Sequence, residues 1–205
     1  RFSAQLGFAI EPETYLALKK FAPRLTMISK ERIRDELVKL ITSSYPETFE
    51  HLYNTGITSV IMPWFDDMIR RKKSDLSYGE MTDGEYVLGL MQKTPASPVL
   101  RLFALLCNLS PEEAKAWMTD MRLDNATISD VCTLIKCKEY PRSETEEDIR
   151  RAMNIAGPLF SDLFTFLRAD AELMSMPYKT KRLEFLNQIE ERYKIITKRG
   201  DCVDL

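Results

Sequence analysis

The chain has 205 residues, of which 44% are hydrophobic and 29% are charged, and its formal net charge is −2. This composition is typical of a soluble globular protein, and so small a net charge does not by itself indicate a polyanion-binding one. No stretch reaches the roughly 18 apolar residues that a membrane span requires, and the first residues do not form a signal peptide. We therefore expect a protein without membrane contact.

The charges are unevenly distributed along the chain. Residues 1–45 contain eight Lys or Arg against five Asp or Glu, and residues 179–199 contain seven against three. Because the whole chain sums to −2, the middle is acidic and both ends are basic.

Helical spacing of apolar residues dominates, and runs that alternate with a period of two are missing, so the sequence predicts an all-α fold. The four cysteines have irregular spacing with no C-x-x-C pair. Cys107 lies in an apolar run, where we expect a small buried side chain and no disulfide. A reducing, cytoplasmic location fits this usage best.

The first predicted helix ends at Gly7, which can adopt a positive φ without a Cβ penalty. The next begins in EPET, where Pro12 suits a first helical turn. Ser29 is the predicted N-cap of the helix KERIRDELVKLI. A further helix in SSYPETFEHLYNTG is expected to end at Gly56. The segment ITSVIMPWFDDMIRRKK then changes from apolar to strongly basic, and we expect its basic end to be a helix terminus.

In the second half, PVLRLFALLCNL at 98–109 is almost entirely apolar, which predicts a helix at the centre of the core. Ser110 and Glu113 form a predicted capping box, with Pro111 in the first turn. Further helices are predicted at about 127–138, after Pro141, and over the apolar stripe from Leu183 to Ile196.

The first 41 residues resemble the neck region of class II tRNA nucleotidyltransferases and bacterial poly(A) polymerases. In that family a run reads RF-x-A-x-LGF, then I-x-PET, then I-S-x-ERIRDEL, and every piece is present without a gap. The matching residues are Arg1, Phe2, Ala4, Leu6, Gly7, Phe8, Ile10, Pro12, Glu13, Thr14, Ile28, Ser29 and Glu31 to Leu37. A run that fixes so many different residue types in order is far more specific than a lone GxGxxG. Weaker matches continue at Phe49–Leu52, Gly56–Ile57 and Ile61–Pro63, and at KRGDCVDL near the end.

The resemblance implies an all-α neck at 1–45, a helical body at 46–138 and a helical tail at 139–205 that is truncated. It also implies that the α/β catalytic head, with its paired carboxylates, Mg²⁺, ATP and CTP, is missing. The family's base-selecting motif should lie just before Arg1. We expect a fragment with no catalytic residue, no cofactor and no activity of its own.

In the family the parts present here hold the acceptor and T arms of tRNA through backbone contacts, which suits recognition of A-form RNA by shape. ERIRDEL resembles the motif that braces the neck helix under the nucleotide pocket, and this bracing role is favoured. The alternatives are direct contact with a ligand and ordinary pairing of Arg32 with Asp35 or Glu36 on the helix surface. The bracing candidates are Glu31, Arg32, Arg34, Asp35 and Glu36.

Basic residues elsewhere are candidates for contacts to RNA phosphates, with solvated helix surface as the alternative. They are Arg70, Arg71, Lys72 and Lys73 in one cluster, and Lys179, Lys181, Arg182, Arg192, Lys194, Lys198 and Arg199 near the end.

Some family members carry a metal-dependent HD domain after the neck, and such a site needs several His and Asp ligands. His51 is the only histidine, and Cys107-Asn108 stands where the resemblance would put His-Asp. We therefore expect an HD-like helical region without metal ligands, and His51 at the surface or the edge of the core. Trp64 and Trp117 could stack on bases, but their apolar helical contexts favour packing.

The sequence thus predicts the tRNA-binding portion of a CTP/ATP-dependent nucleotidyltransferase that adds or repairs the 3′-terminal CCA, with its own catalytic head as a second partner. Two alternatives stay open. One is a poly(A) polymerase of the same family. The other is a helical protein-interaction module, which an exposed apolar segment at 57–65 would support.

Overall fold

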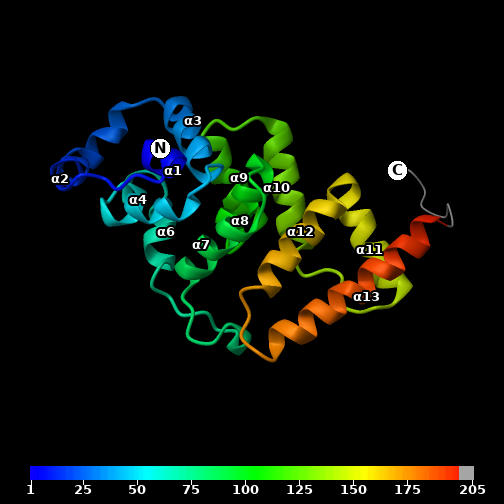
Figure 1. Ribbon diagram of the computed structural model, residues 1–205. Coiled ribbons are helices and arrows are strands. Elements are labelled where there is room, and N and C mark those ends of the chain that lie inside the picture. The colour runs from blue at the N-terminus through cyan, green and yellow to red at the C-terminus, as the bar shows by residue number, and fades with distance from the viewer. Residues whose placement is uncertain (199–205) are drawn as a thin grey trace.

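The computed structural model describes residues 1–198, and this part of the chain is built from helices, with one isolated bridge between Lys72 and Thr82 and no strand (Figure 1). The predicted all-α class is confirmed. Within the same residues, no helix is both long and apolar enough to cross a membrane. Arg199 and the KRGDCVDL match extend beyond the described residues.

The N-terminal third consists of short helices around α3. In chain order they are α1 Phe2–Leu6, α2 Pro12–Phe21, the 3-10 helix η1 Ala22–Met27, α3 Lys30–Ile41, the 3-10 helix η2 Pro46–Phe49, α4 Glu50–Asn54, α5 Thr58–Ile61 and α6 Pro63–Met68. Gly7 follows α1 with φ of 71°, as predicted for a left-handed C-terminal residue. Its backbone also lies close to the ring of Tyr45, which leaves little room for a Cβ.

The central part is organised around α8, the predicted core helix. It contains the 3-10 helix η3 Leu76–Tyr78, α7 Asp83–Lys93, α8 Pro98–Leu106, α9 Pro111–Asp120 and α10 Asn125–Cys137. Every residue of α8 from Leu100 to Leu106 is buried, and α8 packs against α3, α7, α10 and α12. The capping box of Ser110 and Glu113 at the start of α9 is present as predicted.

The C-terminal part comprises α11 Glu146–Ala156, the 3-10 helix η4 Gly157–Leu159, α12 Phe160–Ala171 and α13 Tyr178–Lys198. α12 lies between the central helices and the long α13, which runs along the lower right of the molecule in Figure 1. Phe166 of α12 stacks on Phe103 of α8, with ring centroids 3.9 Å apart. Buried side chains form one continuous cluster from Ala4 to Ile196, so the division into neck, body and tail stays a prediction.

Two expectations for residues 57–73 are wrong. Pro63 divides this segment into α5 and α6, and α6 ends at Met68, so Arg70 to Lys73 lie outside a helix. The apolar residues of 57–65 are also not an exposed patch, because Met62 and Phe65 are fully buried and Ile61 is 5% exposed. This segment therefore gives no support to a protein-interaction module.

Arg101 joins the N-terminal helices to the central ones. It is 5% exposed, and its guanidinium donates to the carbonyl of Ile41 at 2.9 Å and to those of Thr94 and Pro95 at 3.1 and 3.0 Å. Ile41 ends α3 and Thr94 follows α7, so one side chain satisfies carbonyls that the ends of two helices leave without an intrahelical donor.

Replacing Arg101 by Met should lower the free energy of unfolding by about 3 kcal/mol or more, because buried carbonyls lose charged donors while the apolar volume is kept. Urea unfolding followed by circular dichroism measures this change. Lys136→Met, at an exposed position of α10, is the control and should change stability by less than about 0.5 kcal/mol. Equal stabilities of the two variants would contradict the structural role of Arg101.

Candidate nucleic-acid interface

The ERIRDEL helix α3 is tied to its surroundings mainly through the later residues of the motif. Glu36 accepts from Arg1 at 3.2 Å and pairs with Lys39 at 3.1 Å. Arg34 pairs with Asp35 at 2.7 Å and donates to the carbonyl of Arg122, just beyond α9. These contacts fix α3 between α1 and the α9–α10 turn, which is the geometry that a bracing element needs.

The other two residues of the motif behave differently. Glu31 and Arg32 are exposed, and neither forms an ion pair with another of the residues 1–198. Arg32 lines an apolar groove of about 370 Å³ between α3 and η1, together with Ile28 and Leu52. The surface pairing of Arg32 with Asp35 or Glu36 does not form. The bracing role of the motif stays a prediction, and Arg32 is free to meet a ligand.

The basic cluster at 70–73 is largely neutralised by neighbouring carboxylates. Arg71 pairs with Asp83 at 2.6 Å, and Lys72 pairs with Glu80. Arg70 lies over the ring of Tyr53, 5.8 Å from its centroid. Fewer positive charges of this cluster are therefore available to bind phosphates than its four adjacent Lys and Arg residues suggest.

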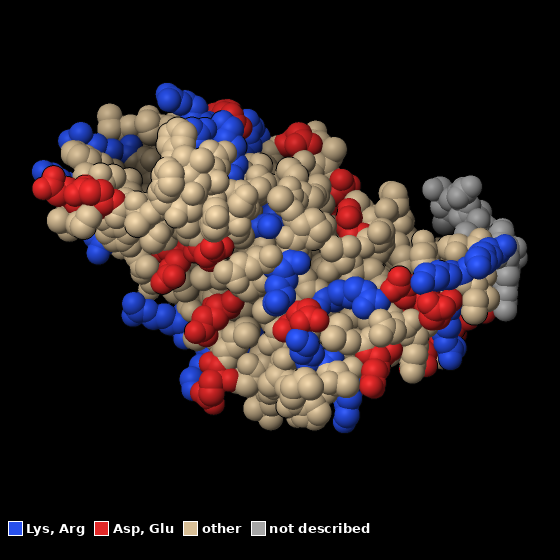
Figure 2. Space-filling view, viewed as in Figure 1, with Lys and Arg blue, Asp and Glu red and all other residues tan. Residues whose placement is uncertain are grey.

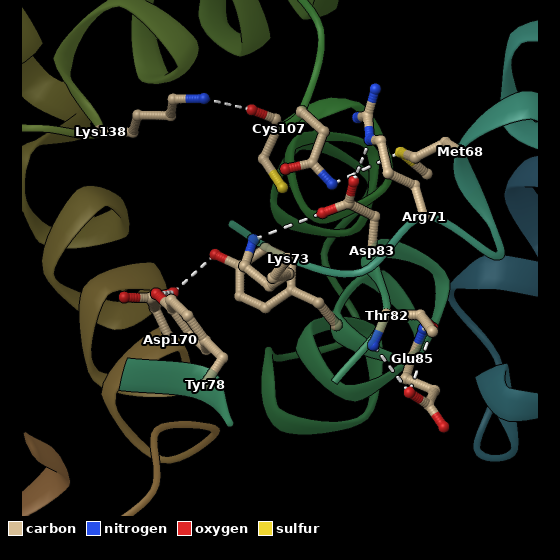
Figure 3. A network of polar contacts seen from close by, with 12 residues as sticks. Met68, Arg71, Lys73, Tyr78, Thr82, Asp83, Glu85, Cys107, Lys138 and Asp170 are labelled. Carbon is tan, nitrogen blue, oxygen red and sulfur yellow. Dashed lines mark hydrogen bonds and ion pairs between the residues drawn. The ribbon is translucent and has the colours of Figure 1, made fainter. Parts of the chain in front are cut away.

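Lys73 turns inward and is largely covered by its neighbours. Its side chain is only 12% exposed, and its ammonium lies 3.5 Å from the ring centroid of Tyr86, 4.8 Å from that of Tyr78 and 3.7 Å from Asp83 (Figure 3). Both tyrosine hydroxyls donate to the buried Asp170, at 2.7 and 2.5 Å. Burial raises the pKa of Tyr86 well above its ordinary value, and Cys107 and Asp170 add to the shift. Tyr86 therefore stays protonated and keeps donating.

The basic residues of α13 are also mostly paired. Lys179 pairs with Glu172 at 2.6 Å, Arg192 with Glu144 at 3.6 Å, and Lys194 with Glu191 at 3.0 Å. Lys181 and Lys198 have no carboxylate partner within the described residues, and the guanidinium of Arg182 stacks near Phe185. Exposed ion pairs of this kind are weak, so RNA phosphates could still compete for these cations.

Sequence reasoning missed the surface that carries the freest cations, formed by α2 and η1. Lys19, Lys20 and Arg24 are exposed and make no ion pair in the described part of the chain. They alternate with aromatic rings: Lys19 lies 5.6 Å from Tyr15, and Lys20 and Arg24 lie 5.8 and 4.8 Å from Phe21. Figure 2 shows Lys and Arg gathered over this end of the molecule, at the upper left. The excess of Lys and Arg over Asp and Glu in residues 1–45 is the sequence signal that could have pointed to these three cations.

Other predicted features serve packing. Trp117 is 9% exposed and donates to the carbonyl of Ile61 at 2.9 Å, and Trp64 meets it edge-on with centroids 6.1 Å apart. Neither is an open stacking platform. His51 is half-buried and packs edge-on against Tyr15, as predicted for the edge of the core.

At the HD-like position, Cys107 and Asn108 stand where a metal-dependent HD site would carry His and Asp. Cys107 is buried and free, and burial raises the pKa of its thiol to about 12. No group of three or more His, Cys, Asp or Glu within residues 1–198 could hold a metal ion. Within residues 1–198, the available donors therefore do not fit the metal site of an HD phosphohydrolase.

Residues 7–69 match a protein family described as "Probable RNA and SrmB- binding site of polymerase A". The chain is 29% identical over 137 residues to the CCA-adding enzyme of Lactobacillus gasseri, a match that covers 66% of this chain and 31% of that protein. It is 54% identical over 44 residues to the CCA-adding enzyme of Leuconostoc mesenteroides, covering 22% and 11%. Over these segments the chain is similar to CCA-adding enzymes. It spans about a third or less of the length of these relatives, and no solved structure matches it.

The family match covers the helices from α2 to α6. The free cations Lys19, Lys20 and Arg24, and the exposed Arg32, all fall inside it, whereas the basic residues of α13 fall outside. The match to the RNA-binding family and the free charge therefore coincide on the same surface.

Lys73→Met should lower the free energy of unfolding by about 1 kcal/mol or more, because the variant lacks both the desolvated cation–π interaction and the ion pair with Asp83. Lys72→Met removes the same charge from a side chain that is 70% exposed, and should cost less than about 0.5 kcal/mol. Urea unfolding of the two variants makes the comparison. A larger destabilisation by the Lys72 substitution than by the Lys73 substitution would show that the inward placement of Lys73 is wrong.

Proposed function

We propose that this chain is the part of a CCA-adding nucleotidyltransferase that holds tRNA, with the α2–η1 surface as its main phosphate-binding face. The observation that carries the proposal is the coincidence of the RNA-binding family match with exposed, unpaired Lys19, Lys20 and Arg24. Lysine and arginine neutralise phosphates without reading sequence, and this suits A-form RNA, whose bases are scarcely accessible from the major groove.

Exposed apolar side chains complete this surface. Leu16 and Met27 are 65% and 82% exposed, and Phe21 is 44% exposed between the cations. Interleaved aromatic and basic side chains suit unpaired nucleotides, because every base offers a face for stacking. We propose that the same surface contacts both the duplex backbone and the unpaired end of the acceptor arm.

A catalytic head, with Mg²⁺, ATP and CTP, belongs to this proposal as the partner that performs nucleotide addition in the cytoplasm. Phe2, Leu6 and Phe8 are 66%, 55% and 67% exposed on or beside α1, and we propose that they pack against that head. A longer protein that includes the head should bind less of the hydrophobic dye ANS than residues 1–205 bind alone. Undiminished dye binding would contradict this contact.

Polymerase A activity is the second candidate, because the matched family is described for a polymerase A. The two activities can be distinguished by the product that a protein including the catalytic head makes. CTP followed by ATP incorporation at a tRNA end indicates CCA addition, whereas repeated AMP addition to unrelated RNA indicates a poly(A) polymerase.

Binding of tRNA should weaken steeply with salt, and the triple variant Lys19→Gln, Lys20→Gln, Arg24→Gln should bind about tenfold more weakly. The slope of log K against log salt should fall by about one for each phosphate that the variant no longer neutralises. Fluorescence anisotropy with labelled tRNA at several KCl concentrations measures both quantities.

The matched control is Lys115→Gln, Lys136→Gln, Arg151→Gln, which removes three exposed cations outside the family match. It should leave the slope nearly unchanged. Equal weakening of tRNA binding in the two triple variants would show that overall charge alone determines binding and would contradict the proposed surface.

Residues 1–205 alone should incorporate no nucleotide into tRNA that lacks its 3′ CCA, because residues 1–198 hold no carboxylate cluster for metal ions. The assay supplies Mg²⁺ with radiolabelled CTP and ATP and resolves the tRNA on a sequencing gel. A catalytically active CCA-adding enzyme serves as the positive control. Measurable incorporation by this chain would contradict the proposal.

A further inference from the structure

A polar cavity of about 670 Å³ lies where the central helices meet α12 and α13. Its wall includes Lys73, Asp83 and Asn108 on one side, and Lys138, Asp170 and Arg182 on the other. The volume falls in the range of small-molecule sites. The cavity is remote in sequence from the α2–η1 surface, and the function proposed above makes no use of it.

The principal carboxylates of this cavity already have partners. Asp83 is held by Arg71 at 2.6 Å and by Lys73 at 3.7 Å. Asp170 accepts both tyrosine hydroxyls described above. Figure 3 shows these groups converging, with the Lys73 ammonium directed at Asp83. Lys73 thus contributes positive charge that balances the buried carboxylate of Asp83.

Three cations of the wall have no carboxylate partner within residues 1–198. Lys138 donates only to the carbonyl of Cys107 (Figure 3), Arg142 lies over the ring of Tyr140 at 4.7 Å, and Arg182 lies over Phe185 at 5.2 Å. The Nε atom of Arg182 is buried without a hydrogen-bond partner. These cations come from the end of α10, the following loop and the start of α13, so folding brings them together.

Six Lys or Arg residues line the cavity against four Asp or Glu, which gives a concave surface of positive potential. Guanidinium groups match phosphate oxygens in geometry and bind them with two parallel hydrogen bonds. Apolar side chains such as Phe166 and Met174 complete the wall. With its volume of about 670 Å³, the cavity can therefore hold a phosphate together with an apolar part of the same ligand.

We propose that this cavity binds a phosphate group, held by Lys138, Arg142 and Arg182. The phosphate belongs either to a small phosphorylated molecule or to an RNA backbone, and the chemistry of recognition is the same in both cases. The site does not depend on tRNA binding at α2–η1.

Isothermal titration of inorganic pyrophosphate into residues 1–205, at constant ionic strength set with KCl, tests the proposal. We expect one saturable site, which binds at least about tenfold more weakly in the double variant Arg142→Gln, Arg182→Gln, since two charge-assisted hydrogen-bond donors are removed. The matched control Arg151→Gln, Lys181→Gln removes two exposed cations that do not line the cavity. It should bind pyrophosphate as the unmodified chain does.

A second titration, in the presence of a short RNA duplex, separates the two sources of phosphate. Competitive displacement of pyrophosphate by the duplex assigns the site to RNA phosphate, and unchanged pyrophosphate binding assigns it to a small molecule. Lys138→Gln provides an independent variant, and urea unfolding checks that every variant is folded. The proposal is overturned by the absence of saturable pyrophosphate binding, or by equal affinities of the double variant and its control.

Discussion

A buried guanidinium at the junction of three helices is the group on which the rest of the structure depends. Arg101 takes the carbonyl that ends α3 and the two that follow α7, while its own helix α8 forms the centre of the core. Arg34 with the carbonyl of Arg122 and Trp117 with that of Ile61 also join the helices that match the RNA-binding family to the central ones, but only Arg101 among these three side chains satisfies carbonyls at the ends of two helices. The position of the α2–η1 surface relative to the cavity beside α13 follows from this junction.

Much of the fold could be predicted from sequence because its signals are local. Gly7, the Ser110 capping box and the apolar run of α8 each specify an element through neighbours a few residues away. The burial of segment 57–73 could not be predicted, because it depends on elements far away in the sequence, such as η1 beside α5 and α7 beside α6. The apolar residues of 57–65 are buried or half-buried, and large exposed apolar side chains are most frequent in residues 2–28.

For the candidate sites too, local sequence signals could be predicted, whereas features that depend on the tertiary fold could not. Charge is densest in the sequence at Arg70–Lys73, yet Asp83 and Glu80 neutralise most of that cluster and Lys73 is drawn between two tyrosines. Whether a cation is available to bind RNA depends on which carboxylates the fold places beside it. This depends on the tertiary structure and cannot be read from the local sequence. Lys19, Lys20 and Arg24 are less dense in sequence but keep their charge available, since no carboxylate of the described residues reaches them. Arg182, a predicted RNA contact, lines the cavity beside α13.

Ultraviolet cross-linking of residues 1–205 to tRNA, followed by mass spectrometry of the digested complex, tests the central claim most directly. Zero-length cross-links form where aromatic side chains meet bases, and Tyr15 and Phe21 lie among the free cations. We expect the cross-linked peptides to come from residues 12–41. Cross-links confined to residues 98–137, or their absence while tRNA remains bound, would contradict the assignment of the α2–η1 surface to RNA.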